Sequence, residues 1–160
     1  MAKVILICGK ICSGKTFYSN KLKINNNAVI LSSDELISDL FHPNENDYHE
    51  QIINKVHQYL FKKTIEIVNN GENVILDWGF WTKKNREDVS KLFNSKGVKF
   101  EWHYIDVSDE KWQRNIENRN GRVLSGDTND YYVDDGLLKK VINKFETPEK
   151  SEIDCWIEEK

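Results

Sequence analysis

Residues 9–16, with the sequence GKICSGKT, match the phosphate-binding pattern G-x-x-x-x-G-K-[ST] at every fixed position, and an apolar run precedes them. The two glycines let successive backbone N–H groups point at phosphate oxygens, because a Cβ would block the close approach. Lys15 adds a positive charge, and the Thr16 hydroxyl can ligate Mg²⁺. The motif therefore predicts a site for ATP and Mg²⁺, lined by Gly9, Lys10, Ile11, Cys12, Ser13, Gly14, Lys15 and Thr16.

Asp34 is a second candidate site residue. It follows the apolar run 28–31, which predicts a strand buried on both faces, and ligands of open α/β sheets bind at the carboxyl ends of strands. The alternative is structural, because Asp34 together with Ser32 or Ser33 could cap a helix over residues 35–41. The residues alone do not favour either interpretation.

Asp77 ends another apolar run, residues 73–77, in the way that the Mg²⁺-holding carboxylate of phosphate-loop enzymes ends its strand. We therefore expect Asp77 on the metal side of the site, with a turn-forming aspartate as the alternative. Trp78, Phe80 and Trp81 follow and are expected in a loop at the same edge of the sheet. They could pack in the core or form the floor of a substrate pocket.

Three arginines mark a third candidate region. Arg114, Arg119 and Arg122 lie on a predicted helix that Ser108 caps, and the polar stretch 123–130 after it predicts a mobile loop. Arginines near a helix C-terminus interact favourably with its dipole, which is one interpretation. The other is a lid over residues 119–133 whose guanidinium groups close over the transferring phosphate.

Strands alternate with helices along the whole chain, which predicts an α/β fold with a parallel sheet covered on both faces. Besides the strand that precedes the phosphate loop, we expect strands over 28–31, 73–77 and 98–106, and residues 153–157 form either a fifth strand or an irregular cap. The expected helices are 16–22, 35–41, 47–69, one from Thr82 to Gly97, one from Ser108, and one from Asp134 or Asp135 to Thr147.

The composition limits the class of protein. The 160 residues are 39% hydrophobic and 31% charged with a net charge of −3, which predicts one globular domain over residues 1–160 and disfavours binding to long nucleic acid. No apolar run approaches the roughly 20 residues needed to span a bilayer, and no signal-peptide pattern is present, so we expect a cytoplasmic protein without membrane contact. The oligomeric state is open between monomer and homodimer.

The motifs together resemble a known family. The phosphate loop, Ser33-Asp34-Glu35, the segment 76–81 (LDWGFW), Arg114 with Arg119-Asn120, and the ending FETP at 145–148 are similar to small bacterial predicted kinases of the phosphate-loop superfamily with AAA-type ATP binding. Chloramphenicol phosphotransferase, zeta toxins and the kinase domain of phage polynucleotide kinase are related groups. The resemblance extends over nearly the whole chain.

The resemblance implies a three-layer phosphate-loop kinase fold with strand order 2-3-1-4-5. It also implies that Asp34 takes the proton of the substrate hydroxyl, that Asp77 lies near Mg²⁺, and that Arg114 contributes to nucleotide binding. Arg119 and Arg122 would lie over the phosphates or the adenine. The expected reaction is transfer of the γ-phosphoryl group of Mg-ATP to a hydroxyl of a small molecule, with Lys15, Asp34, Arg119 and Arg122 as catalytic residues.

The chain departs from the polynucleotide kinase pattern at two positions. Ser33 and Ile37 are neutral where that enzyme has arginines beside its catalytic aspartate, which disfavours recognition of a nucleic-acid end. Two alternatives to a small-molecule kinase stay open: a regulatory module that hydrolyses ATP slowly, and a polynucleotide 5′-hydroxyl kinase. The sequence does not identify the phosphate acceptor.

Overall fold

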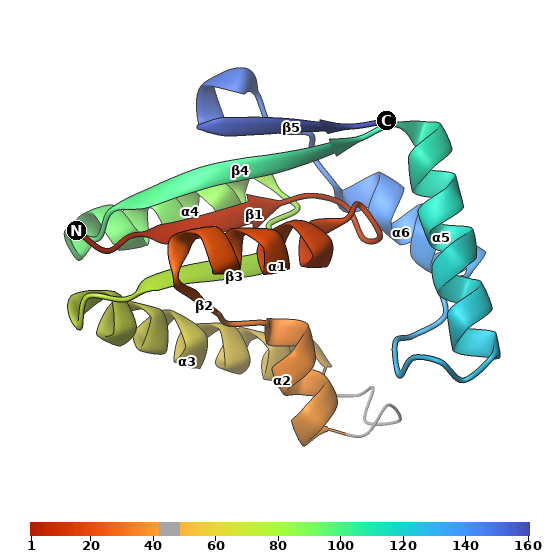
Figure 1. Cartoon of the computed structure of the whole chain (residues 1–160), viewed down its shortest axis with the longest axis horizontal. Coiled ribbons are helices and arrows are strands. Elements are labelled where there is room, and N and C mark those ends of the chain that lie inside the picture. The colour runs from red at the N-terminus through yellow and green to blue at the C-terminus, as the bar shows by residue number, and fades with distance from the viewer. Residues whose placement is uncertain (42–48) are drawn as a thin grey trace.

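The computed structural model describes residues 1–41 and 49–160 and has an α/β fold. Its parallel sheet has five strands in the order β2-β3-β1-β4-β5 (Figure 1), which confirms the order implied by the resemblance. The strands are β1 (Val4–Cys8), β2 (Ala28–Ile30), β3 (Asn73–Gly79), β4 (Phe100–Val107) and β5 (Cys155–Glu159).

Strand β1 lies at the centre of the sheet, and all five of its residues are buried. Because side chains alternate along a strand, Val4, Leu6 and Cys8 join one hydrophobic cluster, while Ile5 and Ile7 join another on the opposite face. A strand buried on both faces is a near-continuous apolar run, as the sequence of β1 is. The phosphate loop begins at its carboxyl end.

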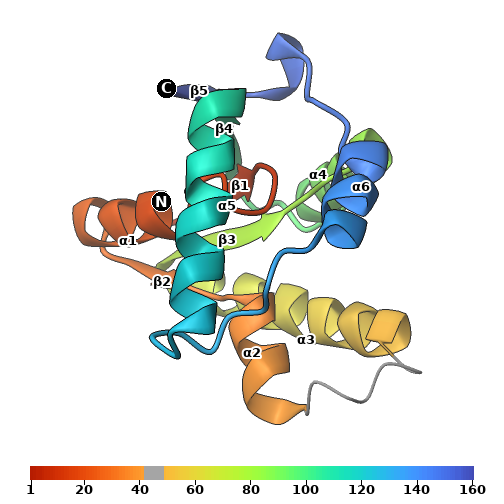
Figure 2. The ribbon, with the colours of Figure 1, turned by 90° about the vertical axis from the view of Figure 1, so that its right-hand side faces the viewer.

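The helices form the outer layers (Figures 1 and 2). Helix α1 covers one face of the sheet, α3 and α4 cover the other, and α5 crosses the edge where the strands end. The helices are α1 (Lys15–Asn26), α2 (Ser33–Leu40), α3 (His49–Asn69), α4 (Lys83–Ser95), α5 (Asp109–Leu124) and α6 (Asp135–Lys144), with a short 3₁₀ helix, η2 (Lys150–Glu152), before β5.

Four helices begin at a side-chain cap. The side chains of Ser32, Thr82, Ser108 and Asp134 each accept a hydrogen bond from the backbone N–H three residues later, at the start of α2, α4, α5 and α6. The caps predicted at Thr82 and Ser108 are thus confirmed, and Asp134 is the cap of the last helix.

Two sequence-based predictions about strands were wrong. Strand β2 is the edge of the sheet, and Val29 is 39% exposed, so the strand is not buried on both faces. Strand β3 extends through Trp78 and Gly79, which were expected in a loop. The reason is a long-range contact: Gly79 pairs with Cys8, and its carbonyl accepts a hydrogen bond from the Gly9 N–H at 3.0 Å.

The helix boundaries differ less from the predicted ones than the strands do. Helix α5 continues to Leu124, so the loop begins two residues after the predicted Val123, and both Arg119 and Arg122 are helical. The predicted start of the long helix at Asp47 lies outside the described residues. Residues 155–159 do form a fifth strand, parallel to β4, which resolves the alternative left open at the end of the chain.

Candidate functional site

The phosphate loop has the tight backbone that its glycines predict. A Cβ on Gly9 would lie 2.7 Å from Ser13 Oγ, so no larger residue fits without movement of the serine. Gly14 has a φ of 98° and Cys12 a φ of 55°, both in the left-handed region. The loop is followed by α1, which begins at Lys15. The N-terminal end of this helix carries a partial positive charge.

Lys15 folds back over the loop. Its Nζ donates to the carbonyl oxygens of Gly9 at 3.1 Å and Lys10 at 2.5 Å. Burial lowers the pKa of Lys15, and the negative charges of Asp34 and Asp77 oppose that shift. The ammonium group therefore lies in the loop with both candidate carboxylates close enough to affect its ionisation.

Two buried polar side-chain atoms at the phosphate loop could donate to an anion. Ser13 Oγ and Arg119 Nε have no hydrogen-bond partner among the described residues. Buried polar groups are normally paired, because leaving one unpaired costs about 1–3 kcal/mol. A phosphate between the loop and Arg119 would offer acceptors to both, so the residues present fit a nucleotide.

Helix α5 lies against the tip of the loop. The Trp112 indole Nε1–H donates to the Ile11 carbonyl at 2.7 Å, and Asn115 Nδ2 donates to the Cys12 carbonyl at 2.8 Å. Arg119 NH1 lies 3.6 Å from Cys12 Sγ. These three helix residues are spaced by three and four positions and so share one face of α5. The sequence analysis singled out neither Trp112 nor Asn115 as a residue of the site.

Arg119 also contacts the segment after α5. Its NH2 lies 3.7 Å from Asp130 Oδ1, and its guanidinium lies over the Tyr131 ring at 4.3 Å from the centroid. Arg114 and Arg122 are exposed, and neither side chain has a hydrogen bond or ion pair with a described residue. Of the three predicted arginines, the structure places only Arg119 against the phosphate loop.

Asp34 is not the cap of α2. That role belongs to Ser32, whose side chain accepts from the Glu35 backbone N–H at 3.2 Å. Asp34 lies exposed in the first turn, and its charge raises the pKa of His57 and of Lys15 against the lowering effect of burial. Asp34 thus lies near Lys15 with its carboxylate not used for capping.

Asp77 is half-buried on β3. Burial raises its pKa, the charge of Lys15 lowers it, and Asp34 raises it further. Thr16 is exposed in the first turn of α1. Mg²⁺ is usually bound by one or two protein oxygens together with substrate phosphates and water. Asp77 and Thr16 are the residues that would hold it, and the metal would neutralise charge on the phosphates.

A buried arginine that the sequence reasoning missed supports the segment after β3. Arg86 NH1 donates to the carbonyl oxygens of Phe80 at 3.0 Å and Glu146 at 3.1 Å, and its Nε donates to Glu152 Oε1 at 2.9 Å. Phe80 has a φ of 47°, which is costly for an aromatic residue. Arg86 therefore holds together a strained turn and the FETP segment at 145–148, which adjoin the phosphate loop through Gly79.

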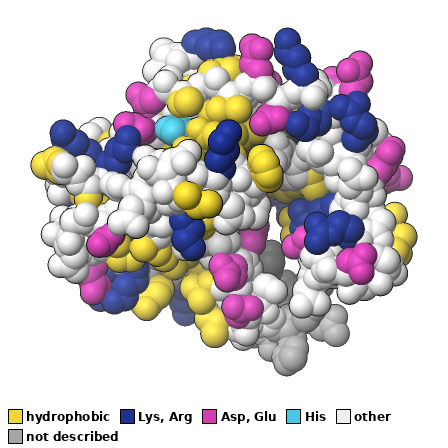
Figure 3. All heavy atoms as spheres, in the orientation of Figure 1, with side chains coloured by type: hydrophobic (Ala, Val, Ile, Leu, Met, Phe, Trp, Pro, Cys, Tyr) yellow, Lys and Arg dark blue, Asp and Glu magenta, His cyan; other side chains and the backbone are white. Residues whose placement is uncertain are grey.

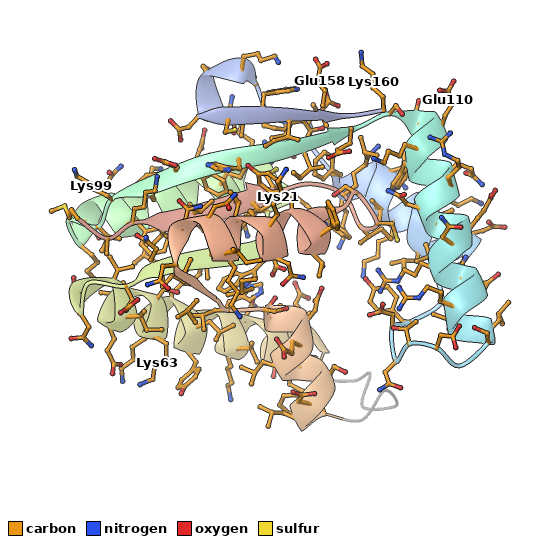
Figure 4. The ribbon with its side chains drawn as sticks, viewed as in Figure 1. Lys21, Lys63, Lys99, Glu110, Glu158 and Lys160 are labelled. Atoms are coloured by element: carbon orange, nitrogen blue, oxygen red, sulfur yellow. The ribbon has the colours of Figure 1, made fainter. Side chains whose placement is uncertain are left out.

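The surface around the site is hollowed between α1 and α5, with acidic side chains towards α2 and basic ones towards α5 (Figure 3). Lys63 lies on the outer side of α3 and Lys99 at the opposite end of the sheet, both far from the phosphate loop (Figure 4). No helix in the described part of the chain is both long and apolar enough to cross a membrane.

Comparison with known proteins adds the family. A model described as an AAA domain matches residues 4–148, whereas no curated protein matches. The structure is similar to a candidate kinase from Chloroflexus aurantiacus, with a TM-score of 0.74 and 17% identity over 99% of this chain and 87% of that one. It is also similar to a gluconokinase from Sinorhizobium meliloti, with a TM-score of 0.61 and 14% identity over 98% and 81% of the two chains.

A third similar structure is Kti12 from Chaetomium thermophilum in complex with ADP-AlF3, with a TM-score of 0.65 and 15% identity over 97% of this chain and 87% of that one. At such identities the structures establish the fold alone. The family match covers most of the chain and includes the phosphate loop, Asp34, Asp77 and α5. The chain therefore belongs to the AAA domain family, and its fold is that of the phosphate-loop kinases.

Proposed function

We propose that this protein is an ATP-dependent kinase that transfers the γ-phosphoryl group of Mg-ATP to a hydroxyl of a small molecule. One observation carries the proposal: Asp34, on α2, lies near Lys15 of the phosphate loop and is not used as the helix cap. ATP binding needs no carboxylate there, whereas transfer to an alcohol does. The similar gluconokinase and candidate kinase support this choice of reaction.

The reaction assigns a task to each group. The loop amides and Lys15 would hold the β- and γ-phosphates, and Thr16 and Asp77 would hold the metal. The acceptor oxygen attacks the γ-phosphorus, the bond from that phosphorus to the bridging oxygen breaks, and ADP leaves. The hydroxyl proton passes to the carboxylate of Asp34. Little covalent chemistry falls to the protein, so catalysis consists mainly of positioning and charge stabilisation.

Arg119 is the arginine best placed to stabilise the transferring phosphoryl group, because it already contacts the loop at Cys12 and has a buried Nε without a partner among the described residues. In this proposal the segment 119–133 is a lid. Arg122 would reach the phosphates when the lid closes, and Arg114, which precedes the lid on α5, would be part of the nucleotide site.

One experiment distinguishes the proposed kinase from two other functions. ATP consumption is measured alone, with a panel of small hydroxyl compounds, and with a 5′-hydroxyl oligonucleotide. A small-molecule kinase consumes ATP only when its acceptor is present, and the phosphorylated acceptor appears by mass spectrometry. Slow ATP consumption that no acceptor accelerates would indicate a regulatory nucleotide hydrolase, and stimulation by the oligonucleotide alone would indicate a polynucleotide kinase.

The net charge of −3 weighs against a nucleic-acid substrate. We extend the proposal to a protein of the cytoplasm that works as a monomer or homodimer, because a small-molecule kinase of this kind needs neither a membrane nor a second protein for its chemistry.

A further inference from the structure

Trp78 connects the strand that carries Asp77 to the chain segment that leads to Asp34. It follows Asp77 directly on β3, and its indole Nε1–H donates to the carbonyl oxygen of Leu31 at 2.7 Å. Leu31 lies between β2 and α2, three residues before Asp34. Its own backbone N–H donates to the Ile75 carbonyl of β3 at 3.0 Å. Both polar backbone groups of Leu31 are therefore bonded to residues of β3, which fixes the chain segment that leads to Asp34.

The indole is itself held by neighbouring rings. His57 of α3 stacks on it with centroids 4.4 Å apart and an interplanar angle of 8°, and Phe61 packs at 4.9 Å. Phe80, on the chain after β3, stacks against it at 5.7 Å with an interplanar angle of 22°. Three aromatic contacts fix the plane of the ring, so the N–H is aimed at Leu31 without freedom to swing away.

The segment between this anchor and Asp34 is short and itself fixed. Ser32 caps α2 and the next residue, Ser33, is only 4% exposed, so the first turn of the helix is seated on the protein. A shift of the Leu31 carbonyl would therefore be passed along the backbone through Ser32 and the buried Ser33 to Asp34.

We propose that Trp78 is a positioning residue for phosphoryl transfer: its indole N–H holds the carbonyl of Leu31 and thereby places the Asp34 carboxylate against the acceptor hydroxyl. This rests on the proposed role of Asp34. A misplacement of about 1 Å in a reacting group can cost about 10²-fold in rate, so a single hydrogen bond at this point controls turnover without contacting the substrate.

Two other tryptophans make the test specific. The Trp112 indole N–H donates to the Ile11 carbonyl at the same distance, 2.7 Å, but it supports the phosphate loop. The Trp156 indole N–H donates to Asp106 Oδ2 at 2.9 Å, on the β4–β5 side of the sheet away from α2. In each, substitution by Phe keeps an aromatic ring and removes the donor.

The experiment compares Trp78→Phe, Trp112→Phe and Trp156→Phe in kcat for acceptor phosphorylation and in affinity for an ATP analogue. We expect Trp78→Phe to lower kcat by about 10- to 100-fold with nucleotide affinity within about twofold. Trp112→Phe should weaken nucleotide binding, and Trp156→Phe should leave both quantities unchanged. A Trp78→Phe protein that turns over at the wild-type rate, or that loses nucleotide affinity in the same proportion as kcat, overturns the proposal.

Hydrogen exchange provides a readout that needs no acceptor. In Trp78→Phe the backbone amides of Glu35 and Leu36, which both donate to Ser32, should exchange several-fold faster, while Trp156→Phe leaves them unchanged. Unchanged exchange there overturns the proposal even if the wild type phosphorylates nothing, so this failure is distinct from failure of the kinase assignment. If Trp78→Phe does not fold, Phe61→Leu loosens the same indole and should give the same two effects more weakly; their absence overturns the proposal equally.

Discussion

Asn115 on α5 donates its side-chain N–H to the carbonyl oxygen of Cys12 at 2.8 Å, across 103 positions of sequence. The bond fixes the tip of the phosphate loop, where the φ of Cys12 is positive. A loop that is already ordered binds its ligand more tightly, because less conformational entropy is lost on binding.

Asn115→Ala should therefore weaken the binding of an ATP analogue by about two- to tenfold, the equivalent of one hydrogen bond of about 0.5–1.5 kcal/mol. Calorimetric titration measures the change. Gln113→Ala is the control, since Gln113 lies on the same helix, is exposed and, among the residues that the structure describes, bonds only to Glu117. Equal affinity in the Asn115 and Gln113 variants would mean that the bond does not order the loop.

Lys15→Met should lower phosphoryl transfer by about 10³-fold, as expected when a preorganised donor to the reacting charge is removed. Thermal unfolding should show no loss of stability at neutral pH. Burial lowers the pKa of Lys15, so the folded protein bears a cost for the charged form at every pH below that lowered pKa, and methionine removes this cost.

Lys21→Met is the control for Lys15→Met, because Lys21 lies exposed further along the same helix (Figure 4). It should leave both transfer and stability as they are. Retained transfer in Lys15→Met would contradict the assignment of the phosphate loop.

Asp77→Asn should stabilise the protein at neutral pH. Burial raises the pKa of Asp77, so its ionised form is disfavoured in the folded state, and the wild type bears that cost once the pH rises through the raised pKa. The gain in free energy of unfolding should shrink as the pH falls towards the ordinary aspartate range. Chemical denaturation at a series of pH values measures it.

Asp88→Asn is the control, because it should change the free energy of unfolding in the opposite direction. Asp88 bonds to Lys84 at 2.7 Å on the surface, which lowers its pKa, so its small contribution is present at neutral pH and lost as the pH falls. If Asp77→Asn also destabilised the protein at neutral pH, Asp77 would be a structural carboxylate held by its surroundings.

How far the sequence predicted this site depends on the range of each contact. The phosphate loop was predicted residue by residue, because its glycines and Lys15 act within a few positions of one another. The positions of Asp34 and Asp77 beside the loop followed from the rule that strand ends share an edge of a parallel sheet. The strand order came from the resemblance.

The supports of the site were not predicted, for a physical reason. Trp112, Asn115 and Arg86 act through side chains that reach backbone carbonyls 60 to 103 positions away, and no local spacing encodes such a pairing. The buried polar residue Arg86 could have drawn attention, but nothing in its neighbours distinguishes it from a surface arginine of α4. The apolar run at β2 was misread for a similar reason, because apolar residues alone do not show that a strand lies at an edge.

The segment 125–132 should become protected from hydrogen exchange when a non-hydrolysable ATP analogue binds. Its far end is already anchored, since Asn120 donates to the Val133 carbonyl at 2.9 Å and accepts from the Val133 N–H at 2.7 Å. The residues between these anchors are held by Arg119 through Asp130 and Tyr131. Closure over the nucleotide must exclude water from the reacting phosphate.

Amides of α4, which covers a face of the sheet and does not lie at the edge that α5 crosses (Figures 1 and 2), serve as the internal control and should not change. Exchange in 125–132 that is the same with and without the analogue would mean that this segment is not a lid.

Asp34→Asn tests the central claim most directly, with Asp39→Asn, on the same helix and exposed, as the matched control. The asparagine keeps the size of the side chain and leaves the Ser32 cap in place, so the fold should persist. We predict that Asp34→Asn binds Mg-ATP within a few-fold of the wild type but loses about 10²- to 10⁴-fold in the rate of acceptor phosphorylation, while Asp39→Asn matches the wild type in both. Transfer by Asp34→Asn at the wild-type rate would contradict the account, because Asp34 would then not be the group that takes the acceptor's proton.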